Sequence, residues 1–128
     1  MKRYLGRFSE QIYGILRIVV GFLFACHGAQ KLLGIFGGPP HLSNPMFLAA
    51  GVIELVGGLM ITVGLFAGIV AFIASGEMAV AYFKAHASGG LLPIVNRGEL
   101  AVLYCFVFLY IAARGSGAFS LDGLTGKR

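Results

Sequence analysis

Four stretches of mostly apolar residues constrain this chain more than any other feature of its sequence. A helix needs about 20 such residues to span a lipid bilayer, and the candidates are residues 12–34, 46–66, 69–87 and 98–114. Segments rich in Gly and Pro separate the first from the second and the third from the fourth, whereas residues 65–68 alone join the middle two. We therefore predict an all-α, integral membrane four-helix bundle, formed as a single domain over residues 1–128 with a polar tail at 115–128.

Composition agrees with lipid as the main solvent of the fold. Hydrophobic residues make up 58% of the chain and charged residues 12%, whereas soluble domains carry about 25% charged residues. A soluble helical bundle would therefore lack the polar residues to cover its surface. The net charge of +5 does not indicate nucleic-acid binding, because the basic residues lie at the chain ends and in loops rather than on one face.

Basic residues at the two ends of the chain predict its orientation. Lysines and arginines favour the cytoplasmic side of a membrane, and they precede the first helix and follow the fourth at positions 2, 3, 7, 114, 127 and 128. We expect both termini in the cytoplasm and the two longer loops on the outer side. No small-residue cleavage site follows the first apolar stretch, so we interpret it as a retained helix rather than a signal peptide.

The first helix contains three basic residues in the segment RIVVGFLFACHGAQKL. Arg or Lys at the middle of a membrane costs about 3 kcal/mol, so such residues usually face the interior of a bundle. At about 100° per residue, Arg17, Gly21, His27, Gly28 and Lys31 fall on one face. We predict a helix that is polar inward and apolar outward. Arg17 lies near the cytoplasmic end, where it can snorkel, and we expect no carboxylate at its depth, which indicates a structural or topological role.

The second and third helices also each contain an ionisable residue within an apolar stretch, Glu54 and Glu77. The segment GVIELVGGLMITVG places glycines around Glu54 on one helix face, which allows neighbouring helices to approach closely. Counted at about 1.5 Å per residue, His27, Glu54, Cys26 and Cys105 lie about 10–12 Å below the outer helix ends, and Glu77 lies slightly deeper. We therefore expect the helices to meet in one polar layer in the outer half of the membrane.

This polar layer has two interpretations that the sequence leaves open. In one, the layer is a network that holds the helices in register. In the other, it is a ligand-binding or proton-handling site, for which the candidates are His27, Lys31, Glu54 and Glu77. A buried carboxyl group without a partner favours its neutral form, whereas with His27 or Lys31 close by at least one glutamate would be ionised. Such coupled groups suit proton exchange with a reducible substrate or a carried solute.

Residues near the fourth helix also have competing interpretations. Asn96 is a candidate N-cap of this helix, and Glu99 lies near the positive end of its dipole. The alternative for either residue is a role in ligand binding. Tyr82 and Tyr104 are either interfacial anchors or pocket-lining residues, and anchoring is favoured.

Cysteines and histidines form no diagnostic redox or metal motif. Cys26 and Cys105 have no CxxC spacing and lie in apolar segments. We interpret them as buried thiols, although their common depth leaves a disulfide or a redox pair open. His27, His41 and His86 could ligate zinc or iron together with the two glutamates, but their spacing is not diagnostic, so we predict no metal site.

Several segments together resemble the DoxX family of small four-helix membrane proteins. They are HGAQKLLGIFGG (27–38), ELVGG (54–58) and GEMAVAYFKAH…GGLLPIVNRGELAVLYC (76–105), followed by the tail GSGAFSLD (115–122). The resemblance implies a multi-pass protein of the bacterial inner (cytoplasmic) membrane, distantly similar to the membrane subunit of thiosulfate:quinone oxidoreductase. The family motifs highlight His27, Lys31, Gly37, Gly38, Glu54, Gly57, Gly58, Glu77, His86, Pro93, Asn96 and Glu99.

From the polar layer and this resemblance we predict a quinone-interacting or redox-accessory membrane subunit. Glu54 and Glu77 would handle protons, while His27 and Lys31 would orient the ligand head group. Glu99 is a further candidate for this role, and the candidates to line the pocket are Tyr82, His86, Asn96, Cys26 and Cys105.

The chain has no haem-ligand pair and no nucleotide fingerprint, so we predict no bound redox centre of its own. Quinone is the expected ligand, because it needs only an apolar slot and one or two hydrogen-bond partners. Electrons would come from a peripheral or membrane oxidoreductase partner. The alternatives are a small-molecule carrier or channel, which could act as a homo-oligomer, and a structural membrane anchor for a peripheral enzyme. Whether the chain is itself catalytic stays open.

Overall fold

The fold is described by a computed structural model that covers residues 1–37 and 43–126, and these residues form helices, turns and loops without a strand. This confirms the predicted all-α class. The α-helices are α1 (Lys2–Leu5), α2 (Ser9–Leu33), α3 (Pro45–Val52), α4 (Gly58–Val63), α5 (Ala67–Ala85), α6 (Pro93–Asn96), α7 (Glu99–Arg114) and α8 (Leu121–Leu124). Two short 3₁₀-helices lie between them, η1 (Gly6–Phe8) between α1 and α2 and η3 (Ala87–Gly89) between α5 and α6. A π-helix, η2 (Ile53–Gly57), joins α3 to α4 without a break.

Within the described part of the chain, three helical segments are long and apolar enough to cross a membrane. They are Lys2–Leu33, Pro45–Val63 and Ala67–Gly89. The fourth predicted span, α7, has 16 residues and is therefore about 24 Å long, which is shorter than a usual membrane-spanning helix. Four spans and cytoplasmic termini accordingly stay predictions.

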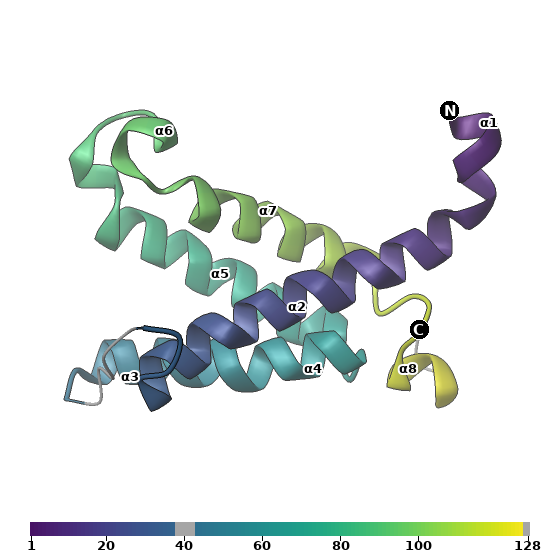
Figure 1. The fold of residues 1–128 in the computed structure, drawn as a ribbon, viewed down its shortest axis with the longest axis horizontal. Helices are drawn as coiled ribbons and strands as arrows, with labels where there is room; N and C mark the ends of the chain where they lie inside the picture. The colour runs from purple at the N-terminus through teal and green to yellow at the C-terminus, as the bar shows by residue number, and fades with distance from the viewer. Residues whose placement is uncertain (38–42, 127–128) are drawn as a thin grey trace.

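The bundle consists of two antiparallel helix pairs, α2 with the continuous α3–η2–α4 helix, and α5 with α7 (Figure 1). In the first pair the backbones touch at glycines. A Cβ atom added to Gly28 would lie 2.2 Å from the Leu55 nitrogen, and one added to Gly58 would lie 2.5 Å from the Ala25 nitrogen. No side chain could stand between the helices there, which confirms the predicted close approach along the glycine face.

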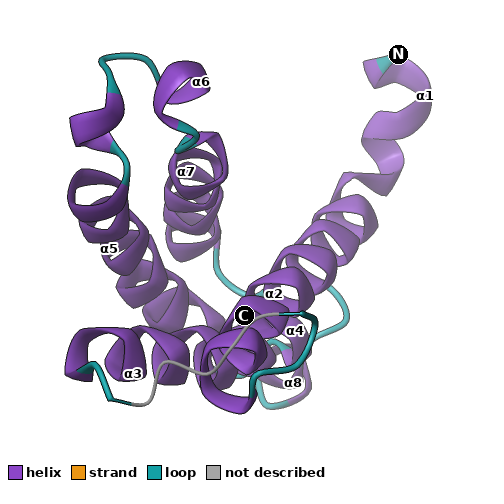
Figure 2. Cartoon of the chain, turned by 60° about the vertical axis from the view of Figure 1, so that its left-hand side comes forward, coloured by secondary structure: helices purple, strands orange, loops and turns teal. Residues whose placement is uncertain are grey.

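The second pair is packed through small residues. Ala67, Ala71 and Ala74 of α5 are fully buried, and the Ser75 hydroxyl donates a hydrogen bond of 2.7 Å to the Cys105 carbonyl oxygen of α7. An aromatic cluster then joins the two pairs, with the Phe24 ring 4.6 Å from that of Phe108 and 5.4 Å from that of Tyr104, measured between centroids. The pairs diverge from this cluster toward the end that carries α3 and α6 (Figures 1 and 2).

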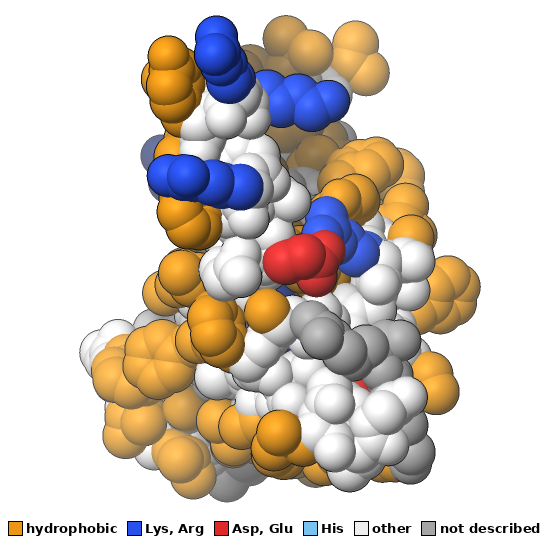
Figure 3. All heavy atoms as spheres, turned by 90° about the vertical axis from the view of Figure 1, so that its right-hand side faces the viewer, with side chains coloured by type: hydrophobic (Ala, Val, Ile, Leu, Met, Phe, Trp, Pro, Cys, Tyr) orange, Lys and Arg blue, Asp and Glu red, His pale blue; other side chains and the backbone are white. Residues whose placement is uncertain are grey.

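Helix α2 has the predicted polar interior and apolar exterior. Its buried residues include Arg17 and three glycines, whereas its exposed residues include the apolar set Ile12, Ile15, Leu16, Val19, Phe22 and Leu23. Ahead of it, α1 and η1 form an arm that projects from the bundle, and Lys and Arg side chains gather along this arm beside hydrophobic ones (Figure 3). The arm carries Lys2, Arg3 and Arg7, three of the basic residues on which the predicted orientation depends.

The interpretation of Arg17 as a snorkelling residue is wrong, because its side chain is 0% exposed. Its Nε donates to the Ile61 carbonyl oxygen at 2.9 Å and its two Nη atoms donate to carbonyl oxygens of residues 115–126, including that of Ser116 and, at 2.7 Å each, those of Ala118 and Phe119. The guanidinium group therefore binds carbonyl groups at the end of α4 and holds the chain that follows α7. The predicted structural role is confirmed.

The segment predicted as a polar tail packs against the bundle and supplies a carboxylate at the level of Arg17. Asp122 is 4% exposed and accepts hydrogen bonds from the Phe66 nitrogen at 3.0 Å and the Ala67 nitrogen at 3.3 Å. These N–H groups begin α5, so the carboxylate caps that helix at its positive end. Asp122 and Arg17 thus close the same end of the bundle from two directions, and we call this end the tail end.

Candidate functional site

A cavity of about 1080 Å³ lies between the two helix pairs, at the end opposite the tail end. Helices α2, α3, η2, α5 and α7 all contribute to its wall, and most of the lining is apolar. Among the ionisable residues predicted to share a polar layer, His27, Lys31, Glu54 and Glu77 all line this cavity, and so does His86. The structure therefore brings five candidate residues from three helical segments to one space.

Lys31 and Glu54 form an ion pair in the cavity wall. The Lys31 Nζ lies 2.6 Å from Oε1 and 2.8 Å from Oε2 of Glu54, and Glu54 is 1% exposed. Hydrogen bonds between charged groups are stronger than neutral ones, so this pair fixes the position of the carboxylate. Glu54 belongs to the π-helix η2, and π-turns within α-helices are rare and often occur at functional sites.

Glu77 provides the least satisfied polar atom of the site. Its Oε1 is buried and has no hydrogen-bond partner among the residues that the structure describes. The Glu77 carboxyl group as a whole lies within hydrogen-bonding reach of the Glu54 carboxyl group and close to Lys31, so within the described part of the chain only its Oε1 atom is left unsatisfied. A buried polar atom without a partner is unfavourable, and native structures rarely leave one in that state. The arrangement therefore suits a ligand that donates a hydrogen bond or a proton to Glu77.

Tyr104 completes the wall beside His27. It is 6% exposed, its ring lies edge-on to the His27 ring at 6.0 Å between centroids, and it stacks on Phe108 at 5.5 Å. The favoured interpretation of Tyr104 as an interfacial anchor is therefore wrong, and the alternative, pocket lining, is the one observed. The available signal was its position in α7 next to Cys105, whose depth matched the polar layer.

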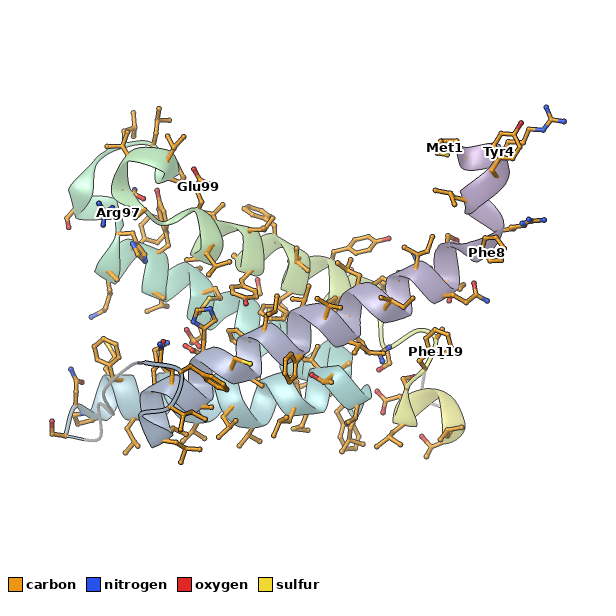
Figure 4. All side chains as sticks on the ribbon, viewed as in Figure 1. Met1, Tyr4, Phe8, Arg97, Glu99 and Phe119 are labelled. Atoms are coloured by element: carbon orange, nitrogen blue, oxygen red, sulfur yellow. The ribbon has the colours of Figure 1, made fainter. Side chains whose placement is uncertain are left out.

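Further basic side chains line the cavity. Lys84 and Arg97 line it together with His86, and Arg97 lies beside α6 (Figure 4). The His86 Nδ1 atom is 3.2 Å from the Asn96 carbonyl oxygen, so this ring is also tied to the loop before α7. No group of three metal-ligating side chains within residues 1–37 and 43–126 could hold a metal ion, and His41 lies outside the described residues.

The comparisons with known proteins identify the family of the chain. The sequence profile of the DoxX family matches residues 13–87, a region that contains Arg17 and the cavity residues His27, Lys31, Glu54 and Glu77. The chain belongs to the DoxX family. Together with the long apolar helices, this makes it a membrane protein.

Two relatives extend the similarity beyond the profile. An uncharacterized protein of Haemophilus influenzae is 44% identical to this DoxX protein, and the match covers 92% of the chain and 93% of the relative. A Bacillus subtilis protein named "Putative oxidoreductase CatD" is 27% identical over 84% of the chain and 82% of its own length. No solved structure matches the chain.

The structure does not bring every candidate of the DoxX protein to the cavity. Cys26, Tyr82, Asn96, Glu99 and Cys105 are absent from its lining. Glu99 lies exposed in the first turn of α7, at the α6 end of the molecule (Figure 4). Cys26 and Cys105 are free thiols, so the structure contains no disulfide between them.

The interpretation of Asn96 as the N-cap of α7 is wrong, because Gly98 occupies that position and no side chain caps the helix. Asn96 is instead the last residue of α6 and braces the loop. Its Oδ1 accepts from the Gly98 nitrogen at 2.8 Å, and its Nδ2 donates to the Tyr82 hydroxyl at 3.0 Å. Tyr82 and Asn96 thus hold the chain that leads into α7 and support the cavity wall from outside.

Proposed function

We propose that this DoxX protein binds the head group of a quinone in the cavity and exchanges protons with it, as a redox-accessory subunit. The observation that carries the proposal is the buried, unpartnered Oε1 of Glu77 beside the Lys31–Glu54 ion pair. A quinol hydroxyl group is a donor of the kind that this oxygen lacks. The oxidoreductase name of the Bacillus subtilis relative CatD supports a redox role.

The donor set and the walls of the cavity fit such a ligand. Small-molecule sites are mostly apolar, with a few polar groups that fix orientation, and this cavity combines apolar walls with Lys31, Glu54 and Glu77 at one place. A quinone head carries two carbonyl oxygens, for which the Lys31 ammonium group and the His27 ring are available donors. The flat ring would pack beside Tyr104, whose ring is held by Phe108.

The side chains have separate roles in this proposal. Reduction of a quinone to a quinol takes up two electrons and two protons, and a partner oxidoreductase supplies the electrons. Glu54 stays paired with Lys31 and keeps the charge of the site fixed. Glu77, whose Oε1 has no hydrogen-bond partner among the described residues, passes protons to the quinone oxygen or accepts them from the quinol. His27 and Lys31 orient the head group.

The same proposal includes an arrangement in the bacterial inner membrane. Helix α7 packs along α5 and serves as the fourth span, with thinner lipid around its 16 residues. The basic arm at Lys2, Arg3 and Arg7 and the tail end face the cytoplasm. The cavity then opens in the outer half of the bilayer, where an oxidoreductase partner or a second copy of the chain would reach it.

Quinone binding by the Glu77→Ala variant tests the proposal. The full-length protein in lipid nanodiscs is titrated with a short-chain benzoquinol and with the matching benzoquinone. We expect the wild-type protein to bind both and the variant to bind the quinol about tenfold more weakly, because a hydrogen bond to a buried oxygen is lost. Glu10→Ala, which removes an exposed carboxylate near the other end of α2, is the matched control and should bind like the wild type.

Two results would contradict this function. A wild-type protein that binds neither form would leave the cavity without its proposed ligand. Equal quinol affinities for the wild type and Glu77→Ala would remove Glu77 from the contact, and with it the observation on which the proposal depends.

A further inference from the structure

Gly76 lies in the cavity wall, and no packing contact explains why it lacks a side chain. A Cβ atom at Gly28 would lie 2.2 Å from a backbone atom of the neighbouring helix, whereas one at Gly76 would meet no atom within 4 Å from elsewhere in the described part of the chain. Gly76 also lies in the middle of α5, where glycine is less favourable than alanine. Its effect is to leave the wall of the cavity open at this point.

Apolar side chains on both sides of Gly76 belong to the cavity and to the outer surface at once. Met46 and Phe47 of α3 and Ile73 and Val80 of α5 line the cavity, yet each is between 41% and 52% exposed. Helices α3 and α5 diverge here (Figure 2). Since the surface of this membrane protein faces hydrocarbon, the opening between α3 and α5 leads sideways into the bilayer.

The cavity is therefore polar on one side and apolar on the other. Lys31, Glu54 and Glu77 provide charge and hydrogen bonding, while Met46, Phe47, Ile73 and Val80 provide apolar contacts at the opening beside Gly76. A small polar solute would gain nothing from that opening. A molecule that joins a polar head to an apolar chain would fill both parts, because the chain leaves the head group free to reach Glu77.

We propose that the ligand is an amphipathic molecule dissolved in the bilayer, which enters sideways between α3 and α5, past Gly76, and leaves its apolar chain in that opening. This inference rests on the proposed function, because it assigns the route and the chain to the quinone whose head group the cavity holds. A phospholipid has the same general chemistry, so the test must distinguish the two sources.

The test compares two quinones that share a head group, one without a chain and one with a ten-carbon chain. Gly76→Leu fills the opening, whereas Gly76→Ala adds one methyl group to space that is free in the structure. We expect Gly76→Leu in nanodiscs to bind the chain-bearing quinone about tenfold more weakly than the wild type does, since a closed apolar slot rejects the chain. Affinity for the chainless quinone should change less than about twofold. Ala113→Leu, which adds equal bulk on an exposed part of α7 outside the cavity, is the control.

Each outcome separates this inference from the proposed function. If wild-type protein binds neither quinone, the proposed function fails and the inference with it. If both quinones bind and Gly76→Leu weakens neither or both equally, the head-group site stands and the sideways route is overturned. If lipid extraction finds a phospholipid in one-to-one amount that quinone does not displace, the opening belongs to lipid and the assignment of the chain is overturned.

Discussion

Arg17→Met should lower the free energy of unfolding by about 4 kcal/mol, because it leaves several buried polar groups without partners. Methionine fills much of the volume but donates no hydrogen bond. The carbonyl groups of Ile61, Ser116, Ala118 and Phe119 would each lose a donor, and the buried Asp122 would lose its nearby positive charge. Unfolding in nanodiscs can be followed by a thiol-reactive dye, since Cys26 and Cys105 are free and partly buried.

The control for this prediction is Arg114→Met, which removes an exposed arginine near the same end of the bundle. It should lower stability far less than Arg17→Met does, because its contacts with Glu10, Tyr110 and the Tyr13 ring lie at the surface and such contacts are individually weak. A double-mutant cycle of Arg17→Met with Asp122→Asn separates the effect of the charge from that of the hydrogen bonds. Loss of the Arg17 positive charge should lower the free energy of unfolding less in the Asp122→Asn background than in the wild type. Stability equal to wild type, with residues after Arg114 still resistant to trypsin, would contradict the assigned role.

The helices and the inward face of α2 could be predicted from the sequence because both depend on local periodicity. Apolar runs and their breaks fix where helices begin and end, and a spacing of 3.6 residues fixes which side chains share a face. Counting helical rise alone places His27 and Glu54 in one layer, with Glu77 slightly deeper and Lys31 shallower. Local geometry is sufficient there because straight antiparallel helices convert residue number into depth.

The tail end could not be predicted in this way. The partners of Arg17 in residues 115–126 are about 100 positions away in sequence, with separations of 99 to 102 residues. Asp122 lies in a polar segment that carries no helical pattern, so nothing local indicates that it caps α5. A buried arginine looks the same in sequence as a snorkelling one, because the difference lies in which distant carbonyl groups reach it.

The π-turn at Glu54 and the burial of Tyr104 were also beyond local patterns. The π-turn lies where the backbone of α2 meets that of Leu55 at Gly28, which is a tertiary contact. Tyr104 has an apolar ring and a polar tip, so it suits an interface and a pocket equally well. Its neighbours Phe24 and Phe108 decide between them. Residues with a dual character are therefore the ones that require the structure.

Gly28→Val is expected to lower the free energy of unfolding by about 3 kcal/mol or more, because overpacking forces a closely fitted backbone contact apart. A Cβ atom at this position would lie 2.2 Å from the Leu55 nitrogen and 2.8 Å from the Glu54 carbonyl carbon. Helix α2 would have to move away from η2 and take Lys31 with it. The 2.6 Å contact between Lys31 and Glu54 would lengthen, so quinone binding should weaken together with stability.

Gly76→Ala is the matched glycine control for this result. It changes a glycine within α5 where nothing lies within 4 Å of the added atom, and it should be neutral or raise stability by up to about 1 kcal/mol through helix propensity. The thiol-reactive assay measures both variants under the same conditions. If Gly28→Val unfolds like the wild type, the backbones of α2 and η2 do not meet at Gly28. We assign the position of the Glu54 carboxylate beside Lys31 to the close approach of these two helices, so this result would mean that another contact holds it there.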